Sequence, residues 1–376
     1  MPILKTKTWR GHKWIFPLFL PDATRGVVRS VDMQDLKKIG LEALMLNSFH
    51  LAQNPGRELI KNQGGIKNFI AWDGGISTDS GGFQVLSLLK QKNIQGKIED
   101  EGLVIYQGNQ RHRKWIFSPE DSIRTQWELG SDLLICLDDF TPPEADEKKA
   151  QETVRRTVLW AQRSYNEFQR LIEENQTPPA QRPLLIAVIQ GGFFFKLRRQ
   201  CAEQLQELNF DGFGFGGWPV LDGKFATELS DFNAQLTPDD KLRFALGIGK
   251  PQDIVQGWEQ GYHLFDCVLP TRDARHQRLY LWRENPAEIT LAQLKEGSFY
   301  EYLYLKRRRY QEEKPISSYC SCHTCNHYSR AFLQHLFRIN ETLAYRLATI
   351  HNLSFYQQLI DRLRELQTSV SQKAAL

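Results

Sequence analysis

The sequence contains no apolar run that approaches the roughly 20 residues needed to cross a bilayer. Its first residues, MPILKTKTWRGHKW, also lack the long apolar core of a secretory signal. No internal repeat or low-complexity segment stands out either. These absences predict a cytoplasmic protein with no membrane-spanning segment.

Cysteine is scarce, and its distribution argues against a disulfide framework. Six cysteines occur in 376 residues, and three of them, Cys320, Cys322 and Cys325, lie within one short segment. Bunched cysteines in a reducing compartment are typical of a metal site. With 41% hydrophobic and 24% charged residues, the composition is that of a globular protein, and a net charge of +4 favours a polyanionic partner only mildly.

Short apolar runs alternate with amphipathic stretches along most of the chain. The runs are RGVVRSV, EALMLNSFH, GISTD, DLLICLDD, PLLIAVIQGG, FDGFGFGG, LRFALGIG and LFDCVLP. Strands that are apolar on both faces and separated by helices indicate an α/β protein with a parallel sheet. Roughly eight of them in about 250 residues are typical of a (β/α)8 TIM barrel. A doubly wound open sheet is the alternative, but no G-x-G-x-x-G follows the first run.

Many of these runs end in a polar residue or a glycine. Each such residue alone is more typical of a helix cap or a turn. Active sites of barrel enzymes, however, gather residues from the carboxyl ends of several strands, so the convergence predicts an active site at that end. The residues concerned are Asp79, Asp138, Gln190, Gly191, Gly216, Gly217, Gly247 and Asp266.

Two of the acidic residues, Asp138 and Asp139, are adjacent in the run DLLICLDD. Because neighbouring strand residues point to opposite faces, we expect only one of them to face the mouth of the barrel. Metal ligation by both carboxylates is the alternative.

The region from about residue 300 differs from the rest, since it is basic, then cysteine-rich, then helical. We therefore expect a barrel over residues 1–300 and an appended zinc-binding helical subdomain over 301–376. The motif C-x-C-x-x-C favours zinc. Spacing alone leaves four histidines open as the fourth ligand: His323, His327, His335 and His351.

Taken in order, the motifs resemble those of the tRNA-guanine transglycosylases. The matching segments are TDSGGFQVLSL, VIQGG, FGGWPV, GIGKPQD, LFDCVLPTRDAR, CSCHTC and TIHN, over roughly residues 17–360. The resemblance implies a (β/α)8 barrel with a zinc subdomain that exchanges the wobble guanine of a tRNA anticodon for a 7-deazaguanine base.

The resemblance also implies roles for the acidic residues. Asp266 matches the nucleophile that traps the ribose covalently, and Asp79 matches the acid and base that serves the leaving and entering bases. The base would be read by Asp138, Gln190 and the backbone of Gly217. Two further residues match those that sandwich the base, Phe83 and Leu246.

Further roles follow from the same resemblance. Basic residues that match tRNA contacts are Lys250, Arg272 and Arg275, and the run 306–309 is either a second RNA contact or a solvated face. His351 matches the fourth ligand of a structural zinc site that also contains Cys320, Cys322 and Cys325. A homodimer contact is matched by Tyr328, Phe332 and His335, for which burial within the subdomain is the alternative.

Relative to the family pattern, residues from about 283 to 300 look inserted in the barrel region. Two positions also depart from the pattern and leave the incoming base open. Phe140 stands where members that take 7-aminomethyl-7-deazaguanine carry cysteine, and Asp222 replaces an expected glutamate. Val220 retains the side chain typical of a small-substituent pocket, so we favour 7-aminomethyl-7-deazaguanine over queuine. The alternatives for the whole protein are a paralogue that modifies DNA and a non-catalytic RNA-binding subunit of a heterodimer.

Overall fold

The computed structural model describes residues 4–82, 95–106, 114–221, 224–307, 310–311 and 313–374. Its central feature is one sheet of eight strands that pair in the order β3, β15, β14, β11, β10, β9, β5, β4. The strands are β3 (Leu18–Pro21), β4 (Ala43–Asn47), β5 (Gly75–Asp79), β9 (Leu133–Ile135), β10 (Leu184–Ile189), β11 (Gly212–Phe215), β14 (Leu242–Ala245) and β15 (Leu264–Cys267).

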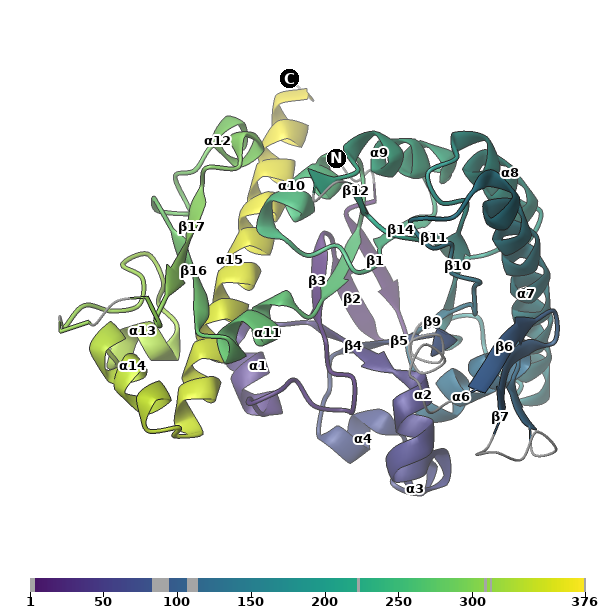
Figure 1. Cartoon of the computed structure of the whole chain (residues 1–376), viewed down its shortest axis with the longest axis horizontal. Helices are drawn as coiled ribbons and strands as arrows, with labels where there is room; N and C mark the ends of the chain where they lie inside the picture. The colour runs from purple at the N-terminus through teal and green to yellow at the C-terminus, as the bar shows by residue number, and fades with distance from the viewer. Residues whose placement is uncertain are drawn as a thin grey trace.

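The sheet closes on itself. All seven of its strand pairings are parallel. Its two end strands meet in a parallel bridge between Asp22 and Met45, where the Ala23 N–H donates to the Met45 carbonyl at 2.7 Å. The (β/α)8 barrel predicted from the sequence is therefore confirmed (Figure 1).

Helices surround the barrel because the segments between strands are amphipathic and capped. Helix α6 (Pro119–Leu129) shows why. Ser118 and Asp121 form a reciprocal capping box at its start, and Gly130 ends it with a φ of 79°. The elements are α1 (Met33–Ile39), α2 (Ser48–Leu51), η1 (Ala52–Gly56), α3 (Arg57–Asn62), α4 (Ile66–Ile70), α6 (Pro119–Leu129), α7 (Glu147–Glu174), α8 (Phe195–Gln206), α9 (Thr227–Leu236), α10 (Pro251–Glu259) and α11 (Leu269–Arg275).

No helix in the described part of the chain is both long enough and apolar enough to cross a bilayer.

Short antiparallel sheets decorate the barrel. A hairpin of β1 (Thr6–Trp9) and β2 (His12–Ile15) packs two stacked rings, Trp9 and Trp14, into the interior cluster at the amino end. A three-stranded sheet follows β5, and a two-stranded one follows β11. They consist of β6 (Gln95–Glu99), β7 (Gly102–Tyr106), β8 (Lys114–Phe117), β12 (Val220–Leu221) and β13 (Lys224–Phe225).

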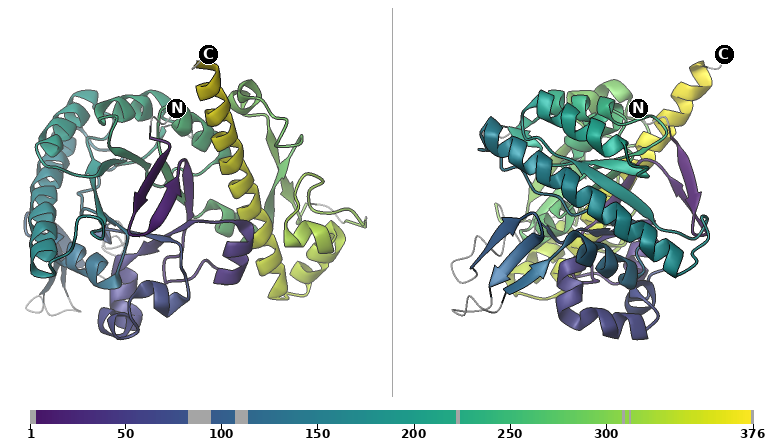
Figure 2. Two further views of the ribbon diagram at one scale, coloured as in Figure 1. Left: turned by 180° about the vertical axis from the view of Figure 1, so that it is seen from behind. Right: turned by 90° about the vertical axis from the view of Figure 1, so that its right-hand side faces the viewer.

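The C-terminal region starts with a hairpin and ends with a long helix. Its elements are β16 (Arg278–Trp282), α12 (Leu291–Glu296), β17 (Tyr300–Tyr304), α13 (His323–His327), α14 (Arg330–Arg338) and α15 (Leu343–Ala374). Figures 1 and 2 show α15 running between the barrel and the β16–β17 hairpin.

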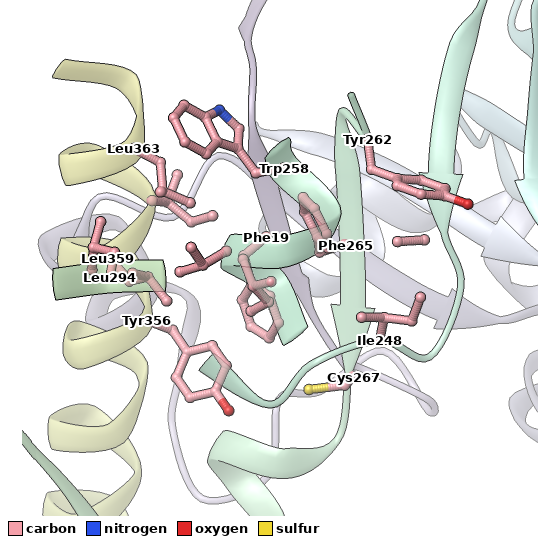
Figure 3. Close-up of a cluster of buried hydrophobic side chains, with 14 of the residues drawn as sticks. Phe19, Ile248, Trp258, Tyr262, Phe265, Cys267, Leu294, Tyr356, Leu359 and Leu363 are labelled. Atoms are coloured by element: carbon pink, nitrogen blue, oxygen red, sulfur yellow. The ribbon is translucent and has the colours of Figure 1, made fainter. Parts of the chain in front are cut away.

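Helix α15 packs closely on the barrel. Figure 3 shows Tyr356 and Leu363 of this helix in one buried cluster with Phe19 of β3 and Trp258 of α10. The Arg346 guanidinium also pairs with Asp35 of α1 at 2.6 Å. By its packing, α15 fills a place in the helical layer of the barrel. Helix α12 lies within residues 283–300, the segment predicted to be an insertion. The predicted division at residue 300 stays a prediction.

Candidate active site and metal cluster

Side chains of the barrel strands alternate between the interior and the helical layer. The interior cluster contains Leu18 and Leu20 of β3, Val188 of β10, Phe244 of β14 and Leu264 of β15. Residues two positions further along each strand therefore face inward at the carboxyl end. This inward ring consists of Asp22, Asn47, Asp79, Gln190, Leu246 and Asp266.

Asp79 lies half-buried at the end of β5. Its Oδ2 accepts a hydrogen bond from the Asn47 side chain at 2.7 Å, and its Oδ1 accepts from the backbone N–H groups of Ser48 and Gly81 at 3.2 and 3.1 Å. Burial, with a contribution from the charge of Asp266, raises the pKa of Asp79 to about 7. The carboxyl can therefore exist in either protonation state near neutral pH.

Asp266 lies half-buried at the end of β15, at the same mouth of the barrel as Asp79. Its Oδ1 accepts from the Gly247 N–H at 3.0 Å. Burial raises the pKa of Asp266 to about 7, and the charge of Asp22 adds to the effect. Asp79 and Asp266 thus face the same mouth, where the charge of Asp266 contributes to the raised pKa of Asp79.

Asp138 follows β9 and faces the mouth. Its Oδ2 accepts from the Gln190 side chain at 2.6 Å, and the Gln190 Oε1 accepts from the Thr141 N–H at 3.2 Å. Burial raises the pKa of Asp138 to about 6, with a smaller contribution from Asp139. Asp138 and Gln190 thus form one hydrogen-bonded unit that joins the ends of β9 and β10.

Asp139 points the other way, into the helical layer. It pairs with Arg156 of α7, and its backbone N–H donates to the Thr157 hydroxyl at 3.1 Å. Only one of the two adjacent aspartates therefore faces the mouth, as the alternation of strand side chains predicts. In the described residues, neither belongs to a group of side chains that could hold a metal ion.

Gly217 follows β11 with a φ of 90°, a conformation that favours glycine. A Cβ at this position would lie 3.5 Å from Gln190 Oε1 and 3.4 Å from Arg198 Nη2. These are ordinary van der Waals distances, so the left-handed φ and not a lack of space favours glycine beside the Asp138–Gln190 unit.

Arg198 of α8 is fully buried and holds this part of the rim together. Its guanidinium donates to the carbonyls of Gly192 and Gly216 at 2.8 and 2.7 Å, and to the Asn233 side chain at 3.0 Å. Burial lowers the pKa of Arg198 to about 10, so it is still a cation at neutral pH. Arg198 thereby fixes the loops that carry Gln190 and Gly217.

Basic side chains surround the mouth on the elements that follow β14, β15 and β3. Lys250 is exposed at the start of α10, and Arg272 and Arg275 lie on α11. Arg275 is half-buried, and its Nη1 has no hydrogen-bond partner in the described residues. Burial lowers the pKa of Arg275, and the charges of Arg29 and Arg272 contribute.

The remaining predicted base contacts are placed unevenly. Leu246 is half-buried and packs against the interior cluster, while Phe140 and Val220 are half-buried beyond β9 and β11. Phe83 and Asp222 lie outside the described residues. The basic run is described only in part, with Lys306 and Arg307 exposed.

A second cluster forms in the C-terminal region, where α13 meets α15. One ligand atom from each of four side chains lies within 4.8 Å of the others: Cys320, Cys322, Cys325 and His351. Cys322 caps α13, and the Cys325 and His351 side chains approach to 3.3 Å. The other three histidines left open by the spacing are exposed and not part of the cluster: His323, His327 and His335.

The chemistry of this cluster fits zinc. Tetrahedral zinc takes Zn–S bonds of about 2.3 Å and Zn–N bonds of about 2.0 Å, which separate its ligand atoms by roughly 3.5 to 4 Å. The Cys322 Sγ and Cys325 Sγ atoms lie 3.8 and 3.3 Å from His351 Nδ1. His351 Nε2 lies 2.8 Å from the Tyr280 carbonyl, so it donates there and leaves Nδ1 for a metal.

Sequence reasoning missed Asp22, Asn47 and Arg198. For Asp22 and Asn47 a signal existed, because each is the polar residue at the end of an apolar run, LFLPD and ALMLN, as Asp79 is in GISTD. For Arg198 there was none, since an arginine in an amphipathic helix is usually exposed.

Comparisons with known proteins agree with this architecture. The family model described as queuine tRNA-ribosyltransferase matches residues 4–367. A queuine tRNA-ribosyltransferase of Thermoanaerobacter sp. is 34% identical over 351 residues, which is 93% of this chain and 85% of that protein. One from Mannheimia succiniciproducens is 36% identical over 349 residues, 93% and 84% of the two chains. The chain therefore belongs to the queuine tRNA-ribosyltransferase family.

Proposed function

We propose that this protein is a tRNA-guanine transglycosylase, a pentosyltransferase that exchanges the wobble guanine of a tRNA anticodon for a 7-deazaguanine base. The observation that carries the proposal is that Asp79 and Asp266 lie at one mouth of a barrel of this family. Neither carboxyl forms an ion pair within the described residues, and the pKa of each is raised to about 7. One can act as a carboxylate while the other holds a proton.

The first half of the reaction needs Asp266 as a carboxylate and Asp79 as a protonated carboxyl. An oxygen of the Asp266 carboxylate bonds to C1′ of the ribose while the bond from C1′ to N9 of guanine breaks. Asp79 gives its proton to the departing guanine, which leaves as the neutral base.

The second half reverses these roles. The Asp79 carboxylate takes the N9 proton of the incoming base as N9 bonds to C1′, and the ester bond to Asp266 breaks. Asp79 is again protonated and Asp266 is again a carboxylate, so the enzyme returns to its starting state.

The base is read by groups at the ends of β9, β10 and β11. Asp138 can accept hydrogen bonds from the N1–H and the exocyclic amino group of a guanine-like edge, and Gln190 and the Gly217 N–H can donate to its carbonyl. Leu246 packs against one face of the base and Phe83 against the other. The target nucleotide must leave its stack to reach this depth.

The basic side chains of α10 and α11 bind the anticodon loop. Lys250 and Arg272 are exposed, so they can reach phosphates, while Arg275 is half-buried and its buried Nη1 is unpaired within the described residues. A splayed RNA loop offers both phosphates and unstacked bases to such a surface.

Zinc bound by the Cys3His cluster would be structural. All four ligand positions are filled by protein atoms, and the cluster ties α13 to α15 away from the barrel mouth. Its thiols need a reducing compartment, which agrees with the proposed cytoplasmic location.

A second copy of the chain would contact α14. Phe332 is 38% exposed, stacks on Tyr328 with ring centroids 5.3 Å apart, and lies near the exposed His335. Light scattering at micromolar concentration should give a dimer that Phe332→Glu converts to a monomer, with Ile339→Glu as an exposed control. A wild-type monomer would remove the dimer from the proposal.

Exchange of radiolabelled guanine tests the function directly, with tRNA and duplex DNA as the two substrates. Incorporation into tRNA alone supports the proposal. Incorporation into DNA identifies the paralogue that modifies DNA, and incorporation into neither identifies a non-catalytic subunit.

The incoming base is decided by competition against labelled guanine. We propose 7-aminomethyl-7-deazaguanine, because Phe140 is larger than the cysteine it replaces and Val220 is typical of a small-substituent pocket, which together favour the aminomethyl group over the bulky cyclopentenediol of queuine. If queuine competes at least as well, Phe140 does not act as a size filter.

A further inference from the structure

We propose that Asp22 reads the 2′-hydroxyl of the target nucleotide and makes the site selective for ribose over 2′-deoxyribose. This inference rests on the proposed transglycosylase function, which gives Asp79, Asp138 and Asp266 their tasks but assigns none to Asp22. It predicts a property that the base-reading residues cannot supply, because guanine is the same base in RNA and DNA.

The backbone places Asp22 inside the mouth. Asp22 and Met45 are partners in the parallel bridge that closes the barrel, and the Met45 side chain belongs to the interior cluster. Partners in register present their side chains on the same face of a sheet, so the Asp22 side chain is on the inner face. It is half-buried, as Asp79 and Asp266 are.

The register also places Asp22 next to the nucleophile. Asp266 of β15 is in register with Leu20 of β3, so Asp22 lies two residues closer to the open end on the neighbouring strand. The charge of Asp22 acts on Asp266 strongly enough to raise the pKa of that carboxyl, which agrees with this proximity.

Asp22 has a free acceptor for a ligand. Its Oδ1 accepts from the Thr24 hydroxyl at 2.5 Å, and within the described residues its Oδ2 has no donor and its carboxylate no ion pair. The charge of Asp22 also acts on Arg275, which lies near Arg29, but neither arginine forms an ion pair with Asp22 in the described residues.

The chemistry of the reaction puts a donor at this position. Asp266 attacks C1′, and the 2′-hydroxyl is carried by the adjacent carbon of the ribose. A carboxylate beside the nucleophile is therefore within reach of that hydroxyl and can accept its hydrogen. In glycosidases, hydrogen bonds to the corresponding 2-hydroxyl strengthen in the transition state, so the contact should act on turnover as well as on binding.

The test compares two anticodon stem-loop RNAs that differ only at the target, which is guanosine in one and 2′-deoxyguanosine in the other. Exchange of labelled guanine gives kcat/KM for each. Because hydrogen bonds to charged groups are worth about 1.5 to 3 kcal/mol, the wild type should prefer guanosine about tenfold to a hundredfold. Asp22→Val should slow exchange on guanosine, leave 2′-deoxyguanosine unchanged and bring the ratio close to one.

Two further variants keep the test decisive. Asp22→Asn retains an uncharged acceptor and should give an intermediate ratio, which also serves if Asp22→Val fails to fold by circular dichroism. Asp73→Asn removes an exposed carboxylate that pairs with Lys37 at 2.9 Å and precedes β5, at the end of the strand opposite the ring, and should keep the wild-type ratio.

Three results would overturn the inference. They are a wild type without preference, an Asp22→Val ratio equal to that of the wild type, and an equal loss of rate on both substrates, which would mean that Asp22 acts only through the charge state of Asp266. Absence of exchange on both substrates in the wild type is distinct from these, because it rejects the proposed function itself.

Discussion

Asp138 and Asp139 are neighbours in the chain, but the protein treats their charges differently. Asp139 is buried in the helical layer and pairs with Arg156, whereas Asp138 faces the barrel mouth and, in the described part of the chain, accepts from the neutral Gln190 side chain without an ion pair. Burial raises the pKa of both carboxyls, but at Asp139 the arginine opposes the shift. One carboxylate serves the fold, and the other is left open to a ligand.

The same difference separates the inward ring at the mouth from the rest of the barrel. Away from the mouth, several buried or half-buried carboxylates are paired: Asp35 with Arg346, Asp132 with Arg10 and Lys67, Asp211 with Arg182, and Asp273 with Arg278. Asp253 of α10 is an exception, half-buried without an ion pair in the described residues. In the inward ring, Asp22, Asp79 and Asp266 have no ion pair within the described residues. Unpaired buried charge costs stability, so the ring is where the fold gives up stability for reactivity.

The largest effect is expected at the cysteine cluster, where a metal ion would compensate the charge of the thiolates. His351→Ala should abolish binding of one zinc per chain and unfold the tail, because structural zinc sites contribute on the order of 10 kcal/mol of binding free energy. Metal analysis and thermal unfolding of the purified protein measure both. The exposed His327→Ala is the control, and zinc retained undiminished in His351→Ala would point to His323 or His327 instead.

The next largest effect is expected at the nucleophile. Asp266→Asn should reduce guanine exchange by at least about a thousandfold, because the covalent step is lost, while tRNA binding stays intact. A matched control is Asp253→Asn, since burial also raises the pKa of Asp253, to about 6, but it lies on α10 outside the ring.

The covalent intermediate gives a second readout for the same assignment. Wild-type protein should form an RNA adduct that resists denaturation. Survival of this adduct in Asp266→Ala together with its loss in Asp79→Ala would exchange the roles of the two residues.

Asp139 should matter for stability and Asp138 should not. Asp139→Asn should lower the free energy of unfolding by about 3 kcal/mol, because it leaves Arg156 in the helical layer with only its more exposed partners. Asp138→Asn should change it by less than about 1 kcal/mol. Urea unfolding at pH 7.5 measures both, and equal losses would remove the distinction between the two regions.

The barrel and the metal cluster could be predicted because their signals are local. The alternation of apolar runs and helices identifies seven of the eight strands, and three cysteines within six residues identify the cluster. The prediction of a strand at RGVVRSV was wrong, since residues 25–31 form turns before α1 and the first barrel strand is Leu18–Pro21. The alternation of side chains also indicates that only one of Asp138 and Asp139 faces the mouth. What single residues do at the mouth was implied only by resemblance, because an aspartate at a strand end is as compatible with a cap.

Other features depend on contacts between distant segments and had no local signal. Arg198 is a buried cation that bonds to the loops after β10 and β11, and nothing in FKLRRQ distinguishes it from the exposed Arg199. The packing of α15 on β3 and α10 likewise joins residues that are more than 90 positions apart. Asp22 and Asn47 were within reach of the strand-end rule but were not selected by it.

The smallest effect is expected from Asp79→Asn. The sign of the change in the free energy of unfolding separates a reactive carboxyl from a structural one. The native pKa of about 7 lies above the ordinary 3.8, so between these values the native state holds a proton that the unfolded chain has lost. Wild-type stability therefore falls as the pH rises from about 4 to 7. Asp79→Asn has no such proton, so it should be close to wild type at pH 4 and more stable by about 1 to 2 kcal/mol above pH 7.

Urea unfolding at several pH values measures this difference, and Glu152 provides a control of opposite sign. The hydrogen bonds that it accepts from Lys149 and Arg156 lower the pKa of Glu152 from 4.5 to about 2, so Glu152→Gln should lose stability relative to wild type as the pH rises between these two values and keep that deficit at higher pH. A pH-independent difference for Asp79→Asn, or a loss of stability that grows with pH, would show that Asp79 is a structural acceptor for Asn47, Ser48 and Gly81. The paired and unpaired carboxylates would then not differ in what they cost the fold.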